Sequence, residues 1–307
     1  MKILGLHHVT AIADNAQRNH HFYTRVLGLR MVKKTVNFDD PSTYHFYFGD
    51  EIGTPGTILT FFPWEGIGQG NTGVGMATQV GYSIPSGSID FWKERFSSEG
   101  ITPKEDTIFG EQSIRFSDPD GLEIVLTETY SPDTRKGWAT DEVHRGVALQ
   151  GFHNVTLNLN RLDPTVAIIT DLLGYQLKDQ ENNRYRFVND SIETANVLDL
   201  IEDRNGSRGR NAAGTIHHVA FRVADDQILM EYQERIRSAG LSVTPKIDRD
   251  YFYSIYFREP GGVLFEIATD NPGFTRDEPV EHLGSALKLP HRYESIREKI
   301  EQVLPKL

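Results

Sequence analysis

Four segments of the chain begin with the same alternation of apolar and polar residues. They are LHHVTAIAD from Leu6, VGYSIPSGS from Val80, FHNVTLNLN from Phe152 and IHHVAFRVAD from Ile216. Sustained alternation is typical of a strand with one buried face, because side chains along a strand point to opposite sides in turn. A pattern that recurs four times along 307 residues predicts one structural unit repeated four times.

Each of these strands is followed by a stretch with the spacing of a helix. In the first stretch Phe22, Val26 and Leu29 fall on one helical face. A glycine closes each stretch, because glycine adopts the left-handed conformation at a helix end without steric cost. The four closing glycines are Gly28, Gly100, Gly174 and Gly240.

Strand-like runs follow each helix, and the last run of three units opens with a turn signal. These runs are TPGTILTFF from Thr54, DPDGLEIVLT from Asp118 and EPGGVLFEIA from Glu259, whereas the third unit ends in NDSIETANVLDLIE without such a signal. Pro-Gly and Asp-Gly pairs mark tight turns. One strand, one helix and three further strands make a βαβββ module, which the sequence predicts four times.

A single βαβββ module leaves its curved sheet half uncovered, so we expect the modules to pair. The prediction is an α+β fold in which four βαβββ modules form two paired, open barrel-like mixed sheets with concave interiors. The stretch SPDTRKGWATDEVHRG is polar and aperiodic, which indicates a linker. In chain order the expected parts are an N-terminal half at 1–130 with modules at about 4–65 and 77–130, a linker at 131–147, a C-terminal half at 148–275 with modules at about 150–203 and 214–270, and a tail at 276–307 with a helix from Arg292.

The composition narrows the class of protein. With 38% hydrophobic and 24% charged residues, the chain has enough apolar side chains for a core. A formal net charge of −11 argues against a nucleic-acid partner, because phosphate contacts need an excess of Lys and Arg. The absence of cysteine excludes disulfides, thiolate metal sites and cysteine nucleophiles. Because we find neither a signal peptide nor an apolar stretch of membrane length, we expect a soluble cytoplasmic protein with no membrane partner.

Two histidine pairs occupy the same point of the first and fourth modules. They are His7-His8 and His217-His218, and Glu266 lies in the last strand of the fourth module. Two strand imidazoles and a strand carboxylate that converge on one face of a closed sheet form the donor set of a facial triad, which suits non-haem Fe(II). The same donors bind Mn(II), so the sequence leaves the choice between iron and manganese open.

Only one histidine of each pair faces the interior, because neighbours on a strand point to opposite sides. When the repeats are aligned on their shared valine, His8 and His218 correspond to Asn154. His153 then corresponds to the first histidine of each pair. We therefore predict His8 and His218 as the inward ligands.

The position of Glu266, four residues after a turn glycine, holds Thr60 in the first module and Val125 in the second. This difference predicts one metal site with modules one and four paired around it, and a metal-free counterpart in modules two and three. A single strand histidine is more often a core or surface residue than a ligand. Repeat-equivalent pairs with a glutamate inside an apolar strand favour a metal, because burial of an unpaired carboxylate is costly.

Several further side chains have two interpretations. His45 either faces a pocket or packs in the core. Four aromatic residues either wall a pocket for an apolar ring or belong to the ordinary core. They are Phe46, Phe61, Phe252 and Tyr253.

These motifs resemble the vicinal-oxygen-chelate superfamily, which includes glyoxalases, bleomycin-resistance proteins and extradiol dioxygenases. The resemblance rests on the four-module pattern and on LHHVTAI, IHHVAF and EPGGVLFE, and it covers roughly residues 4–290. Longer stretches are similar to the ring-cleaving dioxygenases of hydroquinones and chlorohydroquinones and to their Bacillus-type relatives linked to quinone resistance. These stretches are YHFYFGDEIGTPGTILTFFP, DRDYFYSIYFREPGG and DNPGFTRDE.

The resemblance implies the glyoxalase fold and implies that His8, His218 and Glu266 are the iron ligands. It also implies roles beside the metal for Thr10, His217, Arg249 and Tyr256. Catechol enzymes of the superfamily take their first histidine from the third module, which makes His153 the alternative to His8. Strand alternation turns His217 away from the ligands unless the strand bulges, so the implied role of His217 conflicts with that pattern.

The resulting hypothesis is a non-haem Fe(II) dioxygenase of the extradiol type that opens a hydroquinone or catechol-like ring with O2, in the degradation or detoxification of aromatic compounds. Arg249 would steady negative charge, and His217 or Tyr256 would relay protons. One alternative is a glyoxalase-like isomerase or thiol transferase with Zn, Ni or Mn, although such sites usually have a second glutamate where this chain has Thr60. Another is a non-catalytic protein that binds an aromatic compound. The sequence leaves a homo-oligomer open.

Overall fold

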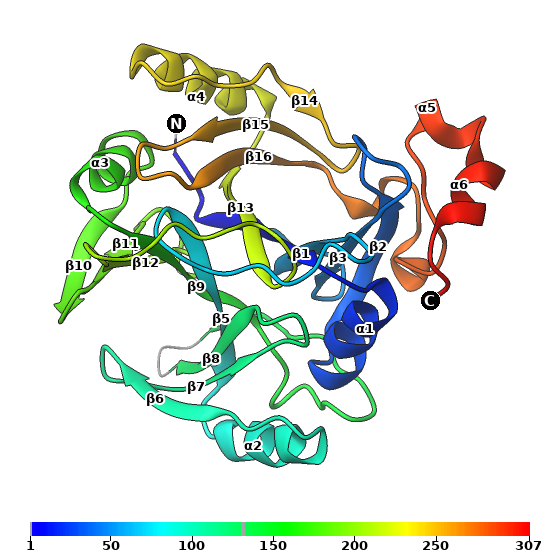
Figure 1. Ribbon diagram of the computed structural model, residues 1–307, viewed down its shortest axis with the longest axis horizontal. Coiled ribbons are helices and arrows are strands. Elements are labelled where there is room, and N and C mark those ends of the chain that lie inside the picture. Colours follow the sequence, from blue (N-terminus) through cyan, green and yellow to red (C-terminus); the bar gives the residue numbers. More distant parts are fainter. Residues whose placement is uncertain (1, 130–132) are drawn as a thin grey trace.

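The computed structural model describes residues 2–129 and 133–307, which form two eight-stranded sheets surrounded by short helices (Figure 1). Of the linker expected at 131–147, residues 131 and 132 lie outside the described part, and 133–147 contain neither helix nor strand. Each sheet draws one module from each expected half of the chain. The boundaries given above for the halves stay a prediction.

The first and fourth modules together build one sheet. The first contains β1 (Leu6–Ala13), α1 (Ala16–His21), a π-helical turn (Phe22–Val26), β2 (Arg30–Val36), β3 (Tyr44–Gly49) and β4 (Ile58–Pro63). The fourth contains β13 (Thr215–Val223), α4 (Asp226–Ser238), β14 (Ile247–Asp248), β15 (Phe252–Arg258) and β16 (Leu264–Pro272). The strand order is β14-β15-β16-β13-β1-β4-β3-β2, so strands from opposite ends of the chain are neighbours at the centre.

The second and third modules build the other sheet. The second contains β5 (Met76–Pro85), α2 (Ile89–Ser98), β6 (Lys104–Ile108), β7 (Glu111–Ser117) and β8 (Glu123–Thr129). The third contains β9 (Gly151–Leu159), α3 (Asp163–Ala167), a π-helical turn (Ile168–Leu172), β10 (Gln176–Glu181), β11 (Arg184–Val188) and β12 (Val197–Glu202). The order is β10-β11-β12-β9-β5-β8-β7-β6, which confirms the predicted class of two paired, mixed sheets.

Helices cover the outer side of the sheets, and α4 illustrates why. Leu229, Tyr232 and Ile236 recur at helical spacing and are buried, so the helix presents one apolar face to β15 and β16. Asp225 caps the helix by accepting a hydrogen bond from the backbone N–H of Ile228. Figure 1 shows α4 lying over these two strands. The concave side of the sheet is therefore left for other groups.

The tail differs from the single helix expected from Arg292. It contains two short helices, α5 (His291–Glu294) and α6 (Arg297–Val303), interrupted at Ser295 and Ile296. Two 3-10 turns precede them, at Phe274–Arg276 and Val280–His282. Ile300 and Leu304, which the helical spacing had marked, are buried in the core.

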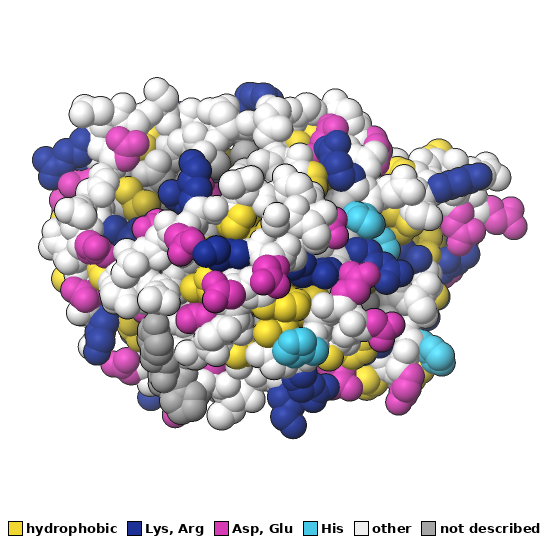
Figure 2. All heavy atoms as spheres, turned by 90° about the horizontal axis from the view of Figure 1, so that it is seen from below, with side chains coloured by type: hydrophobic (Ala, Val, Ile, Leu, Met, Phe, Trp, Pro, Cys, Tyr) yellow, Lys and Arg dark blue, Asp and Glu magenta, His cyan; other side chains and the backbone are white. Residues whose placement is uncertain are grey.

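On the face drawn in Figure 2, basic and acidic side chains are interspersed, and no broad basic area forms among the residues visible there. This one face therefore offers a phosphate backbone no continuous track of positive charge. Within the described ranges no helix combines the length and the apolar character that crossing a membrane requires.

A buried lysine attaches the tail to the edge of the sheet. Lys33 on β2 is fully buried, and its Nζ lies 2.6 Å from Asp277 and 2.5 Å from Glu278. The same ammonium lies 4.8 Å from the ring centroid of Tyr251. Glu278 also accepts hydrogen bonds from backbone N–H groups of the tail, including that of Gly284. Because a buried charge needs partners, this ion cluster couples the tail to the sheet.

We predict that Lys33→Met destabilises the protein by about 3 kcal/mol, because it leaves two carboxylates at the sheet edge without their cation. Urea unfolding of the variant measures this loss. Lys93→Met is the matched control, because Lys93 pairs with Glu105 on the surface, where water screens the ion pair and its contribution to stability is small. Equal, small losses in both variants would contradict the buried cluster's role.

Candidate metal centre

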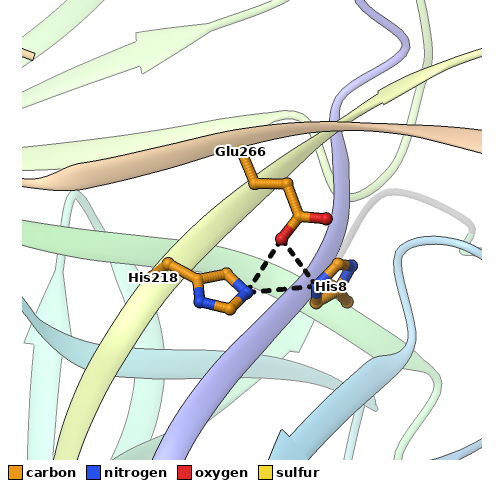
Figure 3. Close-up of side chains that lie close together, drawn as sticks. All are labelled: His8, His218 and Glu266. Atoms are coloured by element: carbon orange, nitrogen blue, oxygen red, sulfur yellow. Dashed lines mark hydrogen bonds and ion pairs between the residues drawn. The ribbon is translucent and has the colours of Figure 1, made fainter. Parts of the chain in front are cut away.

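Three polar side chains from three strands meet on the concave side of the first sheet. His8 comes from β1, His218 from β13 and Glu266 from β16, and Figure 3 shows all three pointing toward one another. Oε2 of Glu266 lies 2.8 Å from Nε2 of His218 and 3.2 Å from Nε2 of His8. The two Nε2 atoms are 3.4 Å apart. In the described part of the chain this is the one cluster of its kind with metal-ligand geometry.

The register of the sheet brings these residues together. His8 lies opposite Ala220 on the antiparallel neighbour β13, and Ala220 lies opposite Glu266 on the parallel neighbour β16. His8, Ala220 and Glu266 therefore form one row across the sheet. His218 precedes Ala220 by two positions, so it shares the face of that row. The side chains converge because their strands are adjacent, although 210 positions separate the two histidines.

The carboxylate of Glu266 is buried and lacks a well-aligned hydrogen-bond donor. Its exposed fraction is 0%, and neither oxygen has a hydrogen-bond partner in the part of the chain that the structure describes. Burial alone would raise the pKa of Glu266, but the two imidazoles hold that pKa well below its usual value. Burial also lowers the pKa of His218. An ionised, fully buried carboxylate that faces two imidazole nitrogens offers the donor set of a divalent cation.

Two β-bulges explain why both histidines of each pair are near the site. In β1 the pairing steps from Leu6 to His8, and in β13 it steps from Ile216 to His218. His7 and His217 are thus the extra residues of the two bulges, and a bulge breaks the strict alternation of a strand. Their rings turn toward their neighbours. Strict alternation would turn the side chain of His217 away from the ligands, and this expectation is wrong. The reason is the bulge in β13, which was named from the sequence as the one exception to that alternation.

His7 fixes which nitrogen of His8 is available to a metal. Nε2 of His7 lies 3.1 Å from the carbonyl oxygen of Thr269, which only accepts, so Nε2 carries the proton. Burial and the neighbouring His8 lower the pKa of His7 well below its usual value, so its Nδ1 is a bare acceptor. Nδ1 of His8 lies 2.9 Å away and therefore donates to it. The lone pair of His8 is left on Nε2, which faces Glu266.

His217 repeats this contact on the other side. Its Nδ1 lies 2.8 Å from Nδ1 of His218. Burial, with a contribution from His218, lowers the pKa of His217 to about 3, so the ring is neutral. When His218 donates from Nδ1, its Nε2 is free as a ligand, and the proton of His217 sits on Nε2. The same Nδ1–Nδ1 contact is therefore present at His8 and at His218, and it orients the rings of both candidate ligands.

A cavity of about 300 Å³ adjoins the three converging side chains. Its walls include both apolar and polar residues of the two modules. The apolar ones include Phe62, Trp64, Phe252 and Leu264, and the polar ones include Thr10, His45, His217, Arg249 and Tyr256. All four residues that the resemblance implies beside the metal therefore line one cavity, although their roles stay a prediction.

Arg249 and Tyr256 form the cationic side of this cavity. Tyr256 lies opposite Glu266 in the β15–β16 ladder, and Nε of Arg249 donates to its hydroxyl over 3.2 Å. Burial and the charge of Glu266 raise the pKa of Tyr256, so it is a neutral phenol. Arg249 also reaches Asp39 across the cavity at 3.5 Å. The arrangement offers a positive charge and a hydroxyl donor to an oxygen atom bound beside Glu266.

His153, the alternative first ligand, lies in the other sheet. Its side chain contacts Glu111 at 3.2 Å and Asn154 at 3.1 Å. Its strand, β9, is not part of the sheet that contains His8, His218 and Glu266. In that sheet Asp199 takes the place of Glu266, because it pairs with β9 as Glu266 pairs with β13. Arg186 binds Asp199 through two hydrogen bonds of 2.8 and 2.9 Å. A guanidinium thus neutralises the buried carboxylate of the second sheet.

The aromatic residues divide according to strand alternation. Phe46 and Phe61, expected as possible pocket walls, pair with each other across β3 and β4 and belong to the core. Phe252 lines the cavity, whereas Tyr253 lies 4.1 Å under the ammonium of Lys246. Sequence reasoning missed Phe62, which lines the cavity. The alternation that starts from Thr60 on the inner face would have found it, because Thr60 and Phe62 share a side of β4.

Comparisons with known proteins give the chain relatives over its whole length. A model of the family described as Glyoxalase/Bleomycin resistance protein/Dioxygenase superfamily matches residues 5–126 and 151–267. The chain is 44% identical over 310 residues to "Putative ring-cleaving dioxygenase MhqE" of Bacillus subtilis, with 100% of both chains covered. It is 34% identical to "Chlorohydroquinone/hydroquinone 1,2-dioxygenase" of Sphingobium indicum, over 97% of this chain and 95% of that relative.

Solved structures give the same picture. A crystal structure titled as a putative dioxygenase from Bacillus subtilis superimposes with a TM-score of 0.96 at 43% identity, covering 100% of this chain and 98% of that chain. Glyoxalase I from Zea mays superimposes with a TM-score of 0.63 at 16% identity, covering 87% of this chain and 92% of that chain. The second match concerns the fold alone.

We predict that His7→Phe weakens the binding of Fe(II) by roughly 10- to 100-fold, because His8 loses the acceptor that fixes its ring and its tautomer. Anaerobic competition between the protein and a chromogenic chelator measures the affinity. His21→Phe is the control, because His21 is exposed on α1. An unchanged affinity in a folded His7→Phe variant would contradict the orienting role of His7.

Proposed function

The chain belongs to the Glyoxalase/Bleomycin resistance protein/Dioxygenase superfamily and is a ring-cleaving dioxygenase, and from this premise we propose that it opens a hydroquinone or catechol-like ring with O2 at one Fe(II) ion. His8, His218 and Glu266 hold the metal in this proposal. The proposal is supported above all by their convergence, since a buried carboxylate without a hydrogen-bond donor faces two imidazole nitrogens.

The donor set of two imidazoles and one carboxylate fits Fe(II). Two imidazoles and one carboxylate leave several coordination positions open, which a substrate and O2 require. When bound, the metal lowers the pKa of a ligated phenol and gives electrons a path between the ring and O2. Mn(II) accepts the same donors, so iron is proposed on the chemistry of O2 and not on the donors alone.

The cavity suits a ligand of one aromatic ring. Its volume of about 300 Å³ lies at the lower end of the range for small-molecule pockets. Phe62, Trp64 and Phe252 supply apolar walls, as the ring of a hydroquinone needs. One relative at 34% identity is named for hydroquinone and chlorohydroquinone, which supports this substrate class.

Four residues around the cavity supply charge and protons. Arg249 balances the negative charge of a substrate that has lost a proton, and Tyr256 holds a hydroxyl proton beside Glu266. His217 would offer an N–H on Nε2 to an oxygen atom of a ligand in the cavity, because its Nδ1 accepts from His218. Thr10 presents a hydroxyl two positions from His8 on the same strand.

The glyoxalase-like alternative lacks a ligand in this chain. In the repeat register Thr60 takes the position of Glu266, since Thr60 pairs with β1 as Glu266 pairs with β13. A second carboxylate is therefore missing where such enzymes usually carry it. We accordingly propose a role in the degradation or detoxification of aromatic compounds.

We predict that Glu266→Ala loses at least nine-tenths of its iron and all measurable turnover while it remains folded, because the site loses its only anionic donor. Metal analysis after anaerobic reconstitution and O2 uptake with hydroquinone measure the two effects. Glu281→Ala, at an exposed position, is the control. Normal iron content in Glu266→Ala would refute the ligand assignment. An iron-loaded wild type that leaves hydroquinone and catechol unchanged would refute the substrate class.

A further inference from the structure

Four polar groups form an unbroken hydrogen-bonded chain that begins beside the candidate metal centre. Oγ1 of Thr10 lies 2.8 Å from Oγ1 of Thr60, which lies 2.9 Å from Nε2 of His45. Nδ1 of His45 lies 2.9 Å from the hydroxyl of Tyr47. Thr10, Thr60 and Tyr47 are at most 1% exposed. Both ends of the chain, Thr10 and Tyr47, line the cavity, and so does His45. We call these four residues the hydroxyl–imidazole chain.

The repeat explains why this chain ends at the metal centre. Thr10 lies opposite Thr60 across β1 and β4, and Thr60 lies opposite Tyr47 across β4 and β3. In module four the corresponding row contains Glu266 and Tyr256. Thr60 thus takes the place of the carboxylate and Tyr47 the place of the tyrosine. The first module retains the inward position of a ligand but fills it with a hydroxyl bonded to an imidazole.

The geometry of His45 is fixed from both sides. Its ring centroid lies 4.1 Å from that of Tyr47 and 4.4 Å from that of Phe62. Burial lowers the pKa of His45 well below its usual value, so the ring is neutral and has one N–H and one bare nitrogen. A neutral imidazole donates on one side and accepts on the other, so all the hydrogen bonds of the chain point the same way. Either Thr10 or Tyr47 directs its free hydroxyl proton into the cavity, and moving one proton along the chain exchanges the two states.

We propose that the hydroxyl–imidazole chain carries the proton of the substrate hydroxyl away from the metal centre, an inference that rests on the proposed function. The O–H bond of the substrate breaks, and its proton passes to Oγ1 of Thr10. The hydroxyl proton of Thr10 passes to Thr60, and that of Thr60 to Nε2 of His45. The Nδ1 proton of His45 passes to the oxygen of Tyr47, which releases its own proton to water in the cavity. One proton leaves, no electron moves, and the substrate remains as a phenolate.

The other polar groups of the cavity are less suited to this task. Nδ1 of His217 is engaged with His218, so His217 has no bare nitrogen for a proton. Tyr256 is a neutral phenol whose oxygen accepts from Arg249. Glu266 is committed to the metal. The hydroxyl–imidazole chain is the route among these described residues that accepts a proton at one end and releases one at the other without using a ligand.

Anaerobic mixing of the iron-loaded protein with 2-nitrohydroquinone tests the proposal, because ionisation of this ring changes its visible absorbance and needs no turnover. We expect Thr60→Val, which replaces a hydroxyl by a methyl group of the same shape, to slow ionisation of the bound probe roughly 100-fold. Thr60→Ser keeps the hydroxyl and is expected to stay within about threefold of the wild type. Iron content is expected to be unchanged in both variants.

Coupling between variants separates a relay from a merely structural role. His45→Phe is expected to slow ionisation as much as Thr60→Val, and the double variant no further, because either substitution already interrupts the chain. Tyr47→Phe, which removes one hydroxyl at the far end, gives a second reading should His45→Phe fold poorly. Ionisation of the probe should show a solvent isotope effect in the wild type, and this effect should fall toward unity in Thr60→Val.

The outcomes distinguish the two levels of inference. Ionisation at the wild-type rate in Thr60→Val and Tyr47→Phe overturns the relay and leaves the proposed function intact. Multiplicative effects of His45→Phe and Thr60→Val also overturn it, because independent losses indicate packing and not a shared path. An iron-loaded wild type that neither ionises the probe nor consumes hydroquinone overturns the proposed function itself.

Discussion

The pairing of β1 with β13 is the contact on which the site depends. These strands come from the first and last quarters of the chain, and their antiparallel register places His8 beside Ala220 and, through it, Glu266. The two bulges in this one ladder add His7 and His217 to the same region. A shift of one residue would turn the ligands to the helix side, because the side-chain period of a strand is two. The centre is therefore a property of the sheet and not of any single module.

The second sheet balances the charge of its buried carboxylate with a side chain. Gln79, Asn154 and Asp199 take the positions of His8, His218 and Glu266. Asp199 is fully buried like Glu266, but Arg186 binds it through both of its oxygens. A buried carboxylate needs a cation, and the two sheets meet that requirement in different ways. Among the described residues no side-chain donor is hydrogen-bonded to Glu266 in the first sheet, which is the physical reason to propose a metal there.

The sequence predicts the module pattern and the converging trio because both follow from short periodicities. The shared valine sets the register, and His8 and His218 are the residues just before it. Bulges carry no comparable signal, since an extra residue in one strand shows only against its partner. The inward position of Asp199 was missed for a related reason, because the third module lacks the turn glycine from which that position is counted. Which face of the sheet Phe61 occupies was not decided from the sequence. Its neighbour Thr60 decides this, because adjacent residues of a strand point to opposite faces.

Four equivalent positions in the repeat now hold Thr60, Val125, Asp199 and Glu266, and their differences assign a task to each module. In the proposed centre the carboxylate of module four is the anionic ligand, whereas the carboxylate of module three binds a guanidinium. Valine makes the position in module two apolar. The hydroxyl of module one is too weak a ligand to replace a carboxylate, but it hydrogen-bonds on both sides, to Thr10 and to His45. A group that hydrogen-bonds on both sides suits proton transfer and not coordination. In the functions proposed above, divergence at this one position therefore separates metal binding from proton transfer within one sheet.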